Sequence, residues 1–125
     1  MKRKFLSIIA CFSLALFIGC GEPKIPEGMN HETYDIGVQA LKIMDKYNDA
    51  DITADEADSR LDSLYNKLDK LELKSDPDDG DVWSEEERNL DIKIDISSFQ
   101  SNLYAYNDAD TYSAADSLRD YLNLN

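Results

Sequence analysis

Histidine and cysteine are scarce in this 125-residue chain, which has one histidine and two cysteines. The single histidine, His31, cannot build the Ser-His, Cys-His or multi-histidine arrangements on which many hydrolases and metal sites depend. Both cysteines, Cys11 and Cys20, lie within the first 20 residues, so the rest of the chain can form no internal disulfide and no cysteine zinc site. We therefore expect a domain that its apolar core alone stabilises, and a protein that is not an enzyme.

Basic residues are also few. The chain has 13 Lys and Arg against 26 Asp and Glu, a formal net charge of −13. Three of the basic residues and none of the acidic ones fall in residues 1–19, so the remainder carries a formal charge of −16. Such a charge repels nucleic acid and anionic lipid head groups. It excludes nucleic acid as a partner and leaves a solvated acidic surface, a basic protein partner or divalent cations.

The N-terminal segment has the layout of a secretory signal. Lys2, Arg3 and Lys4 precede an apolar stretch over residues 5–18, and the small residue Gly19 follows. As a helix, this stretch would reach about 21 Å, whereas the hydrocarbon core of a bilayer is about 30 Å thick. The pattern therefore predicts a segment that is removed rather than a permanent transmembrane helix.

The end of this segment resembles the lipobox of bacterial lipoproteins, with Phe17, Ile18 and Gly19 in the three places before Cys20. Phe17 departs from the usual leucine. The resemblance implies cleavage before Cys20, a fatty-acyl (palmitate) anchor on its thiol, and an extracytoplasmic location on the bacterial cell membrane or outer membrane. Two acyl chains hold a protein durably on a bilayer, because each buried methylene contributes about 0.8 kcal/mol. The expected organisation is a signal peptide at 1–19, a lipidated flexible tether at 20–32 and an acidic helical domain at 33–125.

Helical spacing and capping signals run through the domain. A first helix is expected from about Thr33 to Asn48. Thr53 and Glu56 form an S/T-x-x-E capping box that opens a second helix. Its apolar residues repeat in steps of three and four, which is typical of a bundle seam; they are Ala54, Ala57, Leu61, Leu64, Leu68 and Leu71.

A second capping box, Ser84 with Glu87, opens a third helix, which continues through apolar residues to Tyr106. Within it, residues 90–96 alternate strictly between apolar and polar, which is also the period of a strand. Because no second strand candidate exists, we predict helix here and keep a short strand as the alternative. A last helix is expected over residues 113–122.

An internal repeat organises these helices. The pentapeptide at residues 47–51, Tyr-Asn-Asp-Ala-Asp, recurs unchanged at residues 106–110. It suggests two helical hairpins, 33–73 and 85–122, each turning at this pentapeptide. Neither hairpin can bury its apolar side alone. We therefore predict an all-α fold, a small antiparallel helical bundle built from the two repeated hairpins.

An acidic loop between the hairpins is the candidate metal site. Four carboxylates crowd within six residues, and Gly80 lets the backbone bend toward an ion. Oxygen ligands of this kind suit calcium or magnesium, although acidic loops between helices are commonly just solvated. If an ion binds, its expected ligands are Asp76, Asp78, Asp79 and Asp81.

Tyrosines gather in the last quarter of the chain. Tyrosine is favoured at recognition surfaces, and equally at the wet margins of small cores. A partner-binding patch would contain Tyr104, Tyr106, Tyr112 and Tyr121. Two functions follow: a lipid-anchored interaction or accessory protein that engages a basic partner, and a small cation- or ligand-binding lipoprotein that uses the loop at 76–81.

Overall fold

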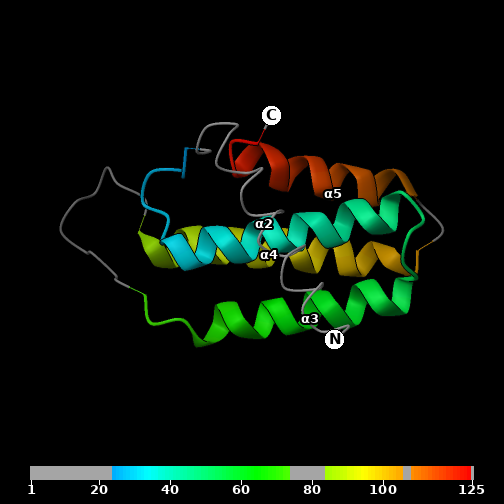
Figure 1. Cartoon of the computed structure of the whole chain (residues 1–125), viewed down its shortest axis with the longest axis horizontal. Helices are drawn as coiled ribbons and strands as arrows, with labels where there is room; N and C mark the ends of the chain where they lie inside the picture. Colours follow the sequence, from blue (N-terminus) through cyan, green and yellow to red (C-terminus); the bar gives the residue numbers. More distant parts are fainter. Residues whose placement is uncertain (1–23, 74–83, 106–107, 125) are drawn as a thin grey trace, which may run out of the picture.

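The computed structural model describes residues 24–73, 84–105 and 108–124. These residues form four helices: α2 at His31–Asn48, α3 at Ala54–Lys70, α4 at Glu85–Leu103 and α5 at Asp108–Tyr121. Consecutive helices run in opposite directions, and α2 and α4 lie between α5 and α3 (Figure 1). The predicted all-α antiparallel bundle is confirmed. We call the end that holds residues 24–30 the proximal end and the end that holds residues 49–53 the turn end.

Local capping explains where the helices begin. The Oδ1 atom of Asn30 accepts the amide of Glu32 at 2.8 Å and starts α2. Both predicted capping boxes are confirmed, because Thr53 and Glu56 exchange reciprocal hydrogen bonds at the start of α3 and Ser84 and Glu87 do so at the start of α4. Each box satisfies amides that the first turn of a helix leaves without a partner.

One apolar core is shared by all four helices. Phe99 of α4 is its largest fully buried side chain, and Tyr47 of α2 packs edge-on against it with the ring centroids 5.7 Å apart. Gly37 lets α2 approach its neighbours, since a Cβ atom there would lie 3.0 Å from Leu122 and 3.1 Å from Ile92. Other large apolar side chains that are fully buried are Met44, Leu61, Leu68, Ile92, Ile96, Leu118 and Leu122.

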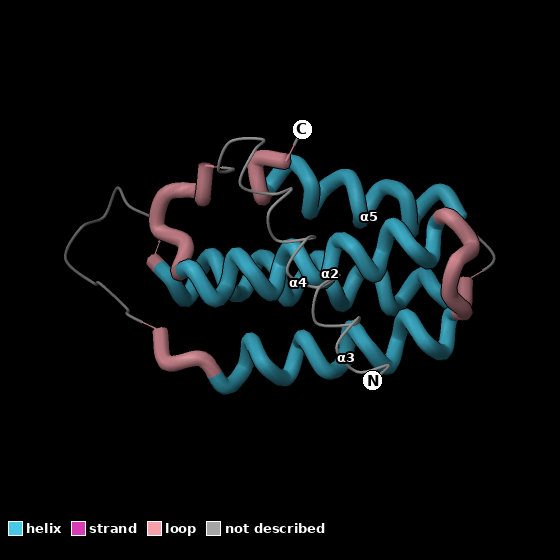
Figure 2. Tube along the Cα trace, in the orientation of Figure 1, coloured by secondary structure: helices cyan, strands magenta, loops and turns pink. Residues whose placement is uncertain are grey.

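Residues 90–96 are helical, so the alternative of a strand is wrong; the described residues are helix and loop throughout (Figure 2). Ile92 and Ile96 are fully buried, whereas Leu90 and Ile94 are 52% and 55% exposed. In a helix, residues two apart point in different directions. The alternation therefore arises from a helix with apolar residues on both its inner and its outer side.

The first copy of the repeated pentapeptide forms the turn that the sequence predicts. The amide of Ala50 donates to Tyr47 O and the amide of Asp51 donates to Lys46 O, which is a Schellman ending of α2. This ending places Ala50 in the left-handed region, with φ at 61°. Glycine usually takes this position because a Cβ atom is strained there.

The second copy does not repeat this conformation. Residues 106 and 107 lie outside the described residues, and Asp108, Ala109 and Asp110 already form the first turn of α5. The predicted turn over 108–110 is therefore wrong, and the last helix begins at 108 rather than 113. The same three residues end one helix and begin another, because tertiary contacts outweigh weak local preferences.

The predicted tether at 20–32 extends too far. Pro26 and Met29 are buried, and α2 begins at His31. Two hydrogen bonds hold the segment on the bundle: Arg88 Nε donates to Glu27 O at 2.9 Å, and Asn123 Nδ2 donates to Lys24 O at 3.4 Å. Residues 24–30 therefore belong to the domain, because burial of their apolar side chains favours packing over free motion.

The two copies of the pentapeptide allow a matched test. Ala50→Gly should raise the free energy of unfolding by about 0.5–1 kcal/mol, because relief of the left-handed strain exceeds the entropy that glycine loses on folding. Ala109→Gly should lower it by about 0.5–1 kcal/mol, because glycine weakens a helix. Urea unfolding of both variants measures the difference. Changes of the same sign would contradict the two conformations.

Candidate functional site

The predicted metal ligands Asp76, Asp78, Asp79 and Asp81 lie outside the described residues, as does Tyr106. Within residues 24–73, 84–105 and 108–124, no group of three or more His, Cys, Asp or Glu side chains is arranged to hold a metal ion. The cation site in the acidic loop stays a prediction.

The remaining predicted tyrosines lie at both ends of the bundle. Tyr104 ends α4 and Tyr112 lies in the first turns of α5, so both are at the turn end. Tyr121 is the last residue of α5, at the proximal end. Nine residues of helix between Tyr112 and Tyr121 correspond to about 14 Å along the axis. Tyr121 therefore lies about 14 Å along the bundle from Tyr112, and the partner-binding patch stays a prediction.

Tyr104 is exposed at the turn end. Its hydroxyl donates to Asp55 Oδ1 at 3.0 Å and reaches Asp58 Oδ2 at 3.5 Å, both on α3. The hydrogen bond to Asp55 raises the pKa of Tyr104, and the nearby negative charges act in the same direction. Because the ring remains 60% exposed, Tyr104 connects α4 to α3 without entering the core.

Tyr121 belongs to a different cluster, at the proximal end. Its hydroxyl donates to Asp91 Oδ2 at 2.9 Å, and the Arg88 guanidinium lies over its ring, 5.2 Å from the centroid. Arg88 also donates to Glu27 O. Burial raises the pKa of Tyr121 to about 12. This cluster joins α4, α5 and the segment at 24–30, so we call it the proximal clamp: Glu27, Arg88, Asp91 and Tyr121.

The turn end contains a pocket of about 290 Å³ between the end of α2 and the beginning of α5. We call it the turn-end pocket. Its walls combine two tyrosine rings, small apolar side chains and two polar residues: Tyr47, Asn48, Ala50, Ile52, Thr111 and Tyr112. Of these, only Tyr112 was among the site residues predicted from the sequence.

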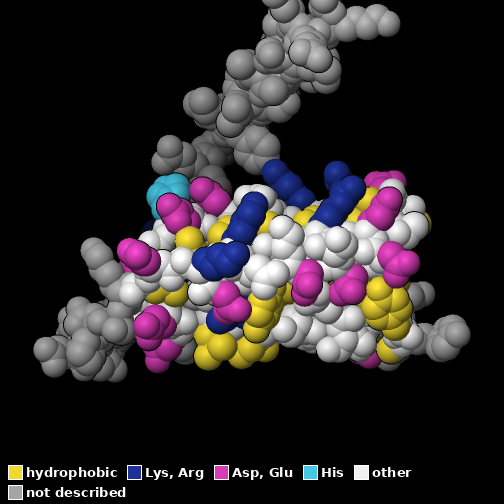
Figure 3. Space-filling model, turned by 90° about the horizontal axis from the view of Figure 1, so that it is seen from below, with side chains coloured by type: hydrophobic (Ala, Val, Ile, Leu, Met, Phe, Trp, Pro, Cys, Tyr) yellow, Lys and Arg dark blue, Asp and Glu magenta, His cyan; other side chains and the backbone are white. Residues whose placement is uncertain are grey.

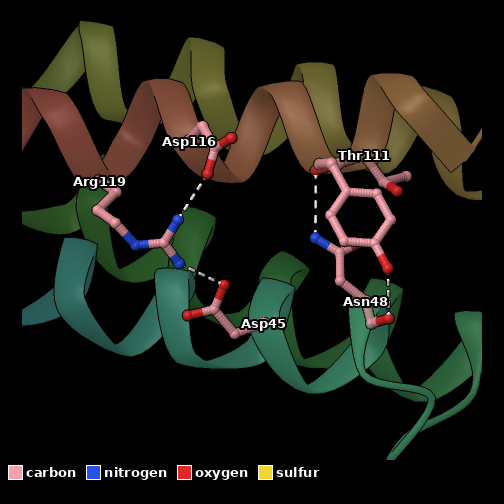
Figure 4. Close-up of polar contacts among 6 residues, drawn as sticks. Asp45, Asn48, Thr111, Asp116 and Arg119 are labelled. Atoms are coloured by element: carbon pink, nitrogen blue, oxygen red, sulfur yellow. Dashed lines mark hydrogen bonds and ion pairs between the residues drawn. The ribbon is translucent and has the colours of Figure 1, made fainter. Parts of the chain in front are cut away.

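Hydrogen bonds between α2 and α5 shape this pocket (Figure 4). The Tyr112 hydroxyl donates to Asn48 O at 2.9 Å, and Asn48 Nδ2 donates to Thr111 O at 3.4 Å. The Oδ1 atom of Asn48 is buried and accepts no hydrogen bond from the described residues. Leaving a buried acceptor without a donor costs about 1–3 kcal/mol, so Asn48 is under-satisfied where it lines the pocket.

An ion-pair cluster on the same two helices holds them together beside the pocket (Figure 4). Arg119 on α5 contacts Asp45 on α2 at 2.6 Å and Asp116 on its own helix at 2.7 Å. The hydrogen bond to Asp45 raises the pKa of the Arg119 guanidinium. Because this arginine is held between two carboxylates, α2 and α5 keep a fixed relative position one to two turns from the pocket.

Charge is unevenly distributed. On the α3 side of the bundle, acidic and basic side chains are interspersed (Figure 3). At the turn end, by contrast, the described side chains of residues 46–58, 104–105 and 109–110 include six acidic ones and a single basic one, that of Lys46. Asp49 and Asp51 are exposed and flank Ala50 in the pocket wall. The turn-end pocket therefore lies in a negative potential that favours cations.

A second depression of about 360 Å³ lies between the beginning of α2 and the end of α3. It is lined mainly by apolar surface with side chains of both charges at its edges: Glu32, Asp35, Ile36, Lys67, Lys70 and Leu71. Opposite charges at its edges give it no preference for a ligand of either sign.

No helix among the described residues is long and apolar enough to span a membrane. Comparison with protein-family models, with curated proteins and with solved structures finds no match.

The proximal clamp predicts a pH effect. Tyr121 ordinarily ionises near pH 10, and its pKa in the folded protein is about 12. Its contribution to stability is therefore fully present below pH 10 and is lost as the pH rises from about 10 to 12. In chemical unfolding at stepped pH values, Tyr121→Phe should lose less stability across this range than the unsubstituted protein.

Tyr112→Phe is the matched control, since it removes a hydroxyl from an exposed ring at the opposite end. It should keep the alkaline loss of stability seen in the unsubstituted protein. Equal pH profiles for Tyr121→Phe and the unsubstituted protein would contradict the assignment to the proximal clamp.

Proposed function

We propose that this chain is a lipid-anchored, extracytoplasmic interaction protein of a bacterium, without catalytic activity, that engages a basic protein partner through its turn end. The observation that carries the proposal is that the two ends of the bundle differ. The chain joins the domain at one end, and the acidic, tyrosine-lined pocket lies at the other.

Covalent geometry supports this arrangement. Cys20 is the expected lipid attachment point, and four residues of fully extended chain from Cys20 to Lys24 span at most about 14 Å. Residue 24 is fixed to the bundle by Asn123, and residue 27 by Arg88. A lipid on Cys20 would therefore keep the proximal end close to the bilayer.

The same geometry carries the turn end away from the lipid. The 19 residues of α4 correspond to an axis of about 28 Å. A partner that approaches from outside the membrane would meet Asp49, Asp51 and the turn-end pocket. Acidic surfaces of this kind accelerate encounter with basic partners and repel acidic ones.

Substitution of the attachment residue tests the anchor. Cys20→Ala should abolish incorporation of radiolabelled palmitate and move the protein from the membrane fraction to the soluble fraction, or leave it as an unprocessed precursor. Cys11→Ala is the control, because Cys11 lies in the segment that is expected to be removed, and it should be labelled and processed normally. Fully processed, membrane-bound Cys20→Ala protein would overturn the lipoprotein assignment.

Crosslinking in native membranes tests the interaction. The unsubstituted protein should yield a stoichiometric partner of basic character, and Cys20→Ala should lose it because the local concentration at the membrane falls. An anchored protein that crosslinks to no partner would contradict the interaction function while leaving the anchor intact.

A further inference from the structure

We propose that the turn-end pocket binds a single arginine side chain of a protein partner. The inference rests on the proposed interaction function and deepens it, since it names the site and the chemical group that the partner inserts. Three observations carry it: the size of the pocket, the fixed tyrosine rings and the surrounding charge.

The volume is sufficient for one long side chain. The turn-end pocket measures about 290 Å³, which is at the lower limit of the range of about 300–1,000 Å³ for pockets that enclose small ligands. It is also open to solvent on one side, between the end of α2 and the beginning of α5. An extended side chain that projects from another protein surface fits such a shape.

The charged groups beside the pocket are hydrogen-bond acceptors. Asp49 and Asp51 are exposed and carry acceptor oxygens, while Asn48 O already accepts the Tyr112 hydroxyl. Arginine presents five N–H donors and no acceptor, in a fixed planar arrangement. A guanidinium group can therefore donate to the carboxylates beside the pocket, whereas a carboxylate cannot.

The two tyrosine rings provide aromatic surfaces with restricted motion. Tyr47 packs edge-on against Phe99 in the core, at an interplanar angle of 85°. Tyr112 is held by its hydrogen bond to α2. The face of an aromatic ring attracts a cation, and a planar guanidinium also stacks on it. Because the rings are already held in place, binding costs little additional side-chain entropy.

Charge selects a cation for this pocket. Asp49 and Asp51 flank its wall, and the described side chains of the turn end include six acidic ones and one basic one. Arg119, on the helix that forms one side of the pocket, is engaged by Asp45 and Asp116 and so does not occupy the pocket itself. A partner's arginine is the complementary group.

The test uses the intact chain in detergent and nuclear magnetic resonance. The probe is Nα-acetyl-arginine N-methylamide, and its neutral counterpart is Nα-acetyl-citrulline N-methylamide, which has nearly the same shape. The arginine probe should shift the amide signals of residues 47–52 and 111–112 in a saturable manner. The citrulline probe should bind at least about tenfold more weakly, because it lacks the positive charge.

Two exposed tyrosines give matched variants. Tyr112→Ala removes a wall of the pocket and should weaken binding of the arginine probe roughly tenfold. Tyr104→Ala removes a similarly exposed ring at the same end that lines no part of the pocket, and it should bind as the unsubstituted protein does. Both positions are about half exposed or more, so both variants should fold, and their amide spectra verify this directly.

Three results would overturn the inference: equal binding of the citrulline probe, equal loss in the two tyrosine variants, or shifts that spread over the acidic surface and disappear in physiological salt. Failure of this inference and failure of the proposed function are distinguishable. If a basic partner crosslinks in membranes but the arginine probe does not bind, only the proposed role of the pocket is contradicted. If the arginine probe binds specifically but no membrane partner is found, the proposed interaction function is contradicted instead.

Discussion

The shared apolar core is the constraint on which the rest of the structure depends. Neither helical hairpin can bury its apolar side alone, and no cysteine beyond residue 20 is present to strengthen the fold. All four helices therefore have to meet around Phe99 and its neighbours. Gly37 permits a close approach of α2 to its neighbours, since even a methyl group there would press on Leu122 and Ile92. Packing at this density fixes how the helix ends face one another.

The candidate site is a consequence of this packing. Residues at the end of α2 and the beginning of α5 are distant in the sequence, and the core brings them together. Arg119 then connects the two helices through Asp45, and Tyr112 closes onto Asn48. At the opposite end, the proximal clamp fixes the incoming chain to α4 and α5. One end of the bundle is thus committed to holding the chain, while the other presents an acidic pocket.

The sequence predicts those features that local interactions decide. The capping boxes at Thr53 and Ser84 and the spacing of the buried leucines depend on residues within one or two turns, and all of them are confirmed. The conformation of the repeated pentapeptide is not decided by local interactions: the first copy ends a helix, and Asp108 already begins one.

The sequence does not predict the turn-end pocket for the same reason, because Thr111 and Ile52 carry no chemical signal until the fold places them beside Asn48. Pro26 and Met29 likewise fall in a segment whose composition is typical of a tether, and only the fold buries them.

The central claim is that the domain is held at a membrane by its proximal end and presents its turn end outward. Energy transfer from the protein to a fluorescent lipid head group measures this directly. Lipidated protein on vesicles would carry one dye at Glu86→Cys, near the proximal end, or at Asp51→Cys, beside the turn-end pocket; both side chains are exposed acids. The account predicts clearly stronger transfer from position 86, given an axis of about 28 Å between the ends. Equal transfer from both positions, or stronger transfer from position 51, would contradict it.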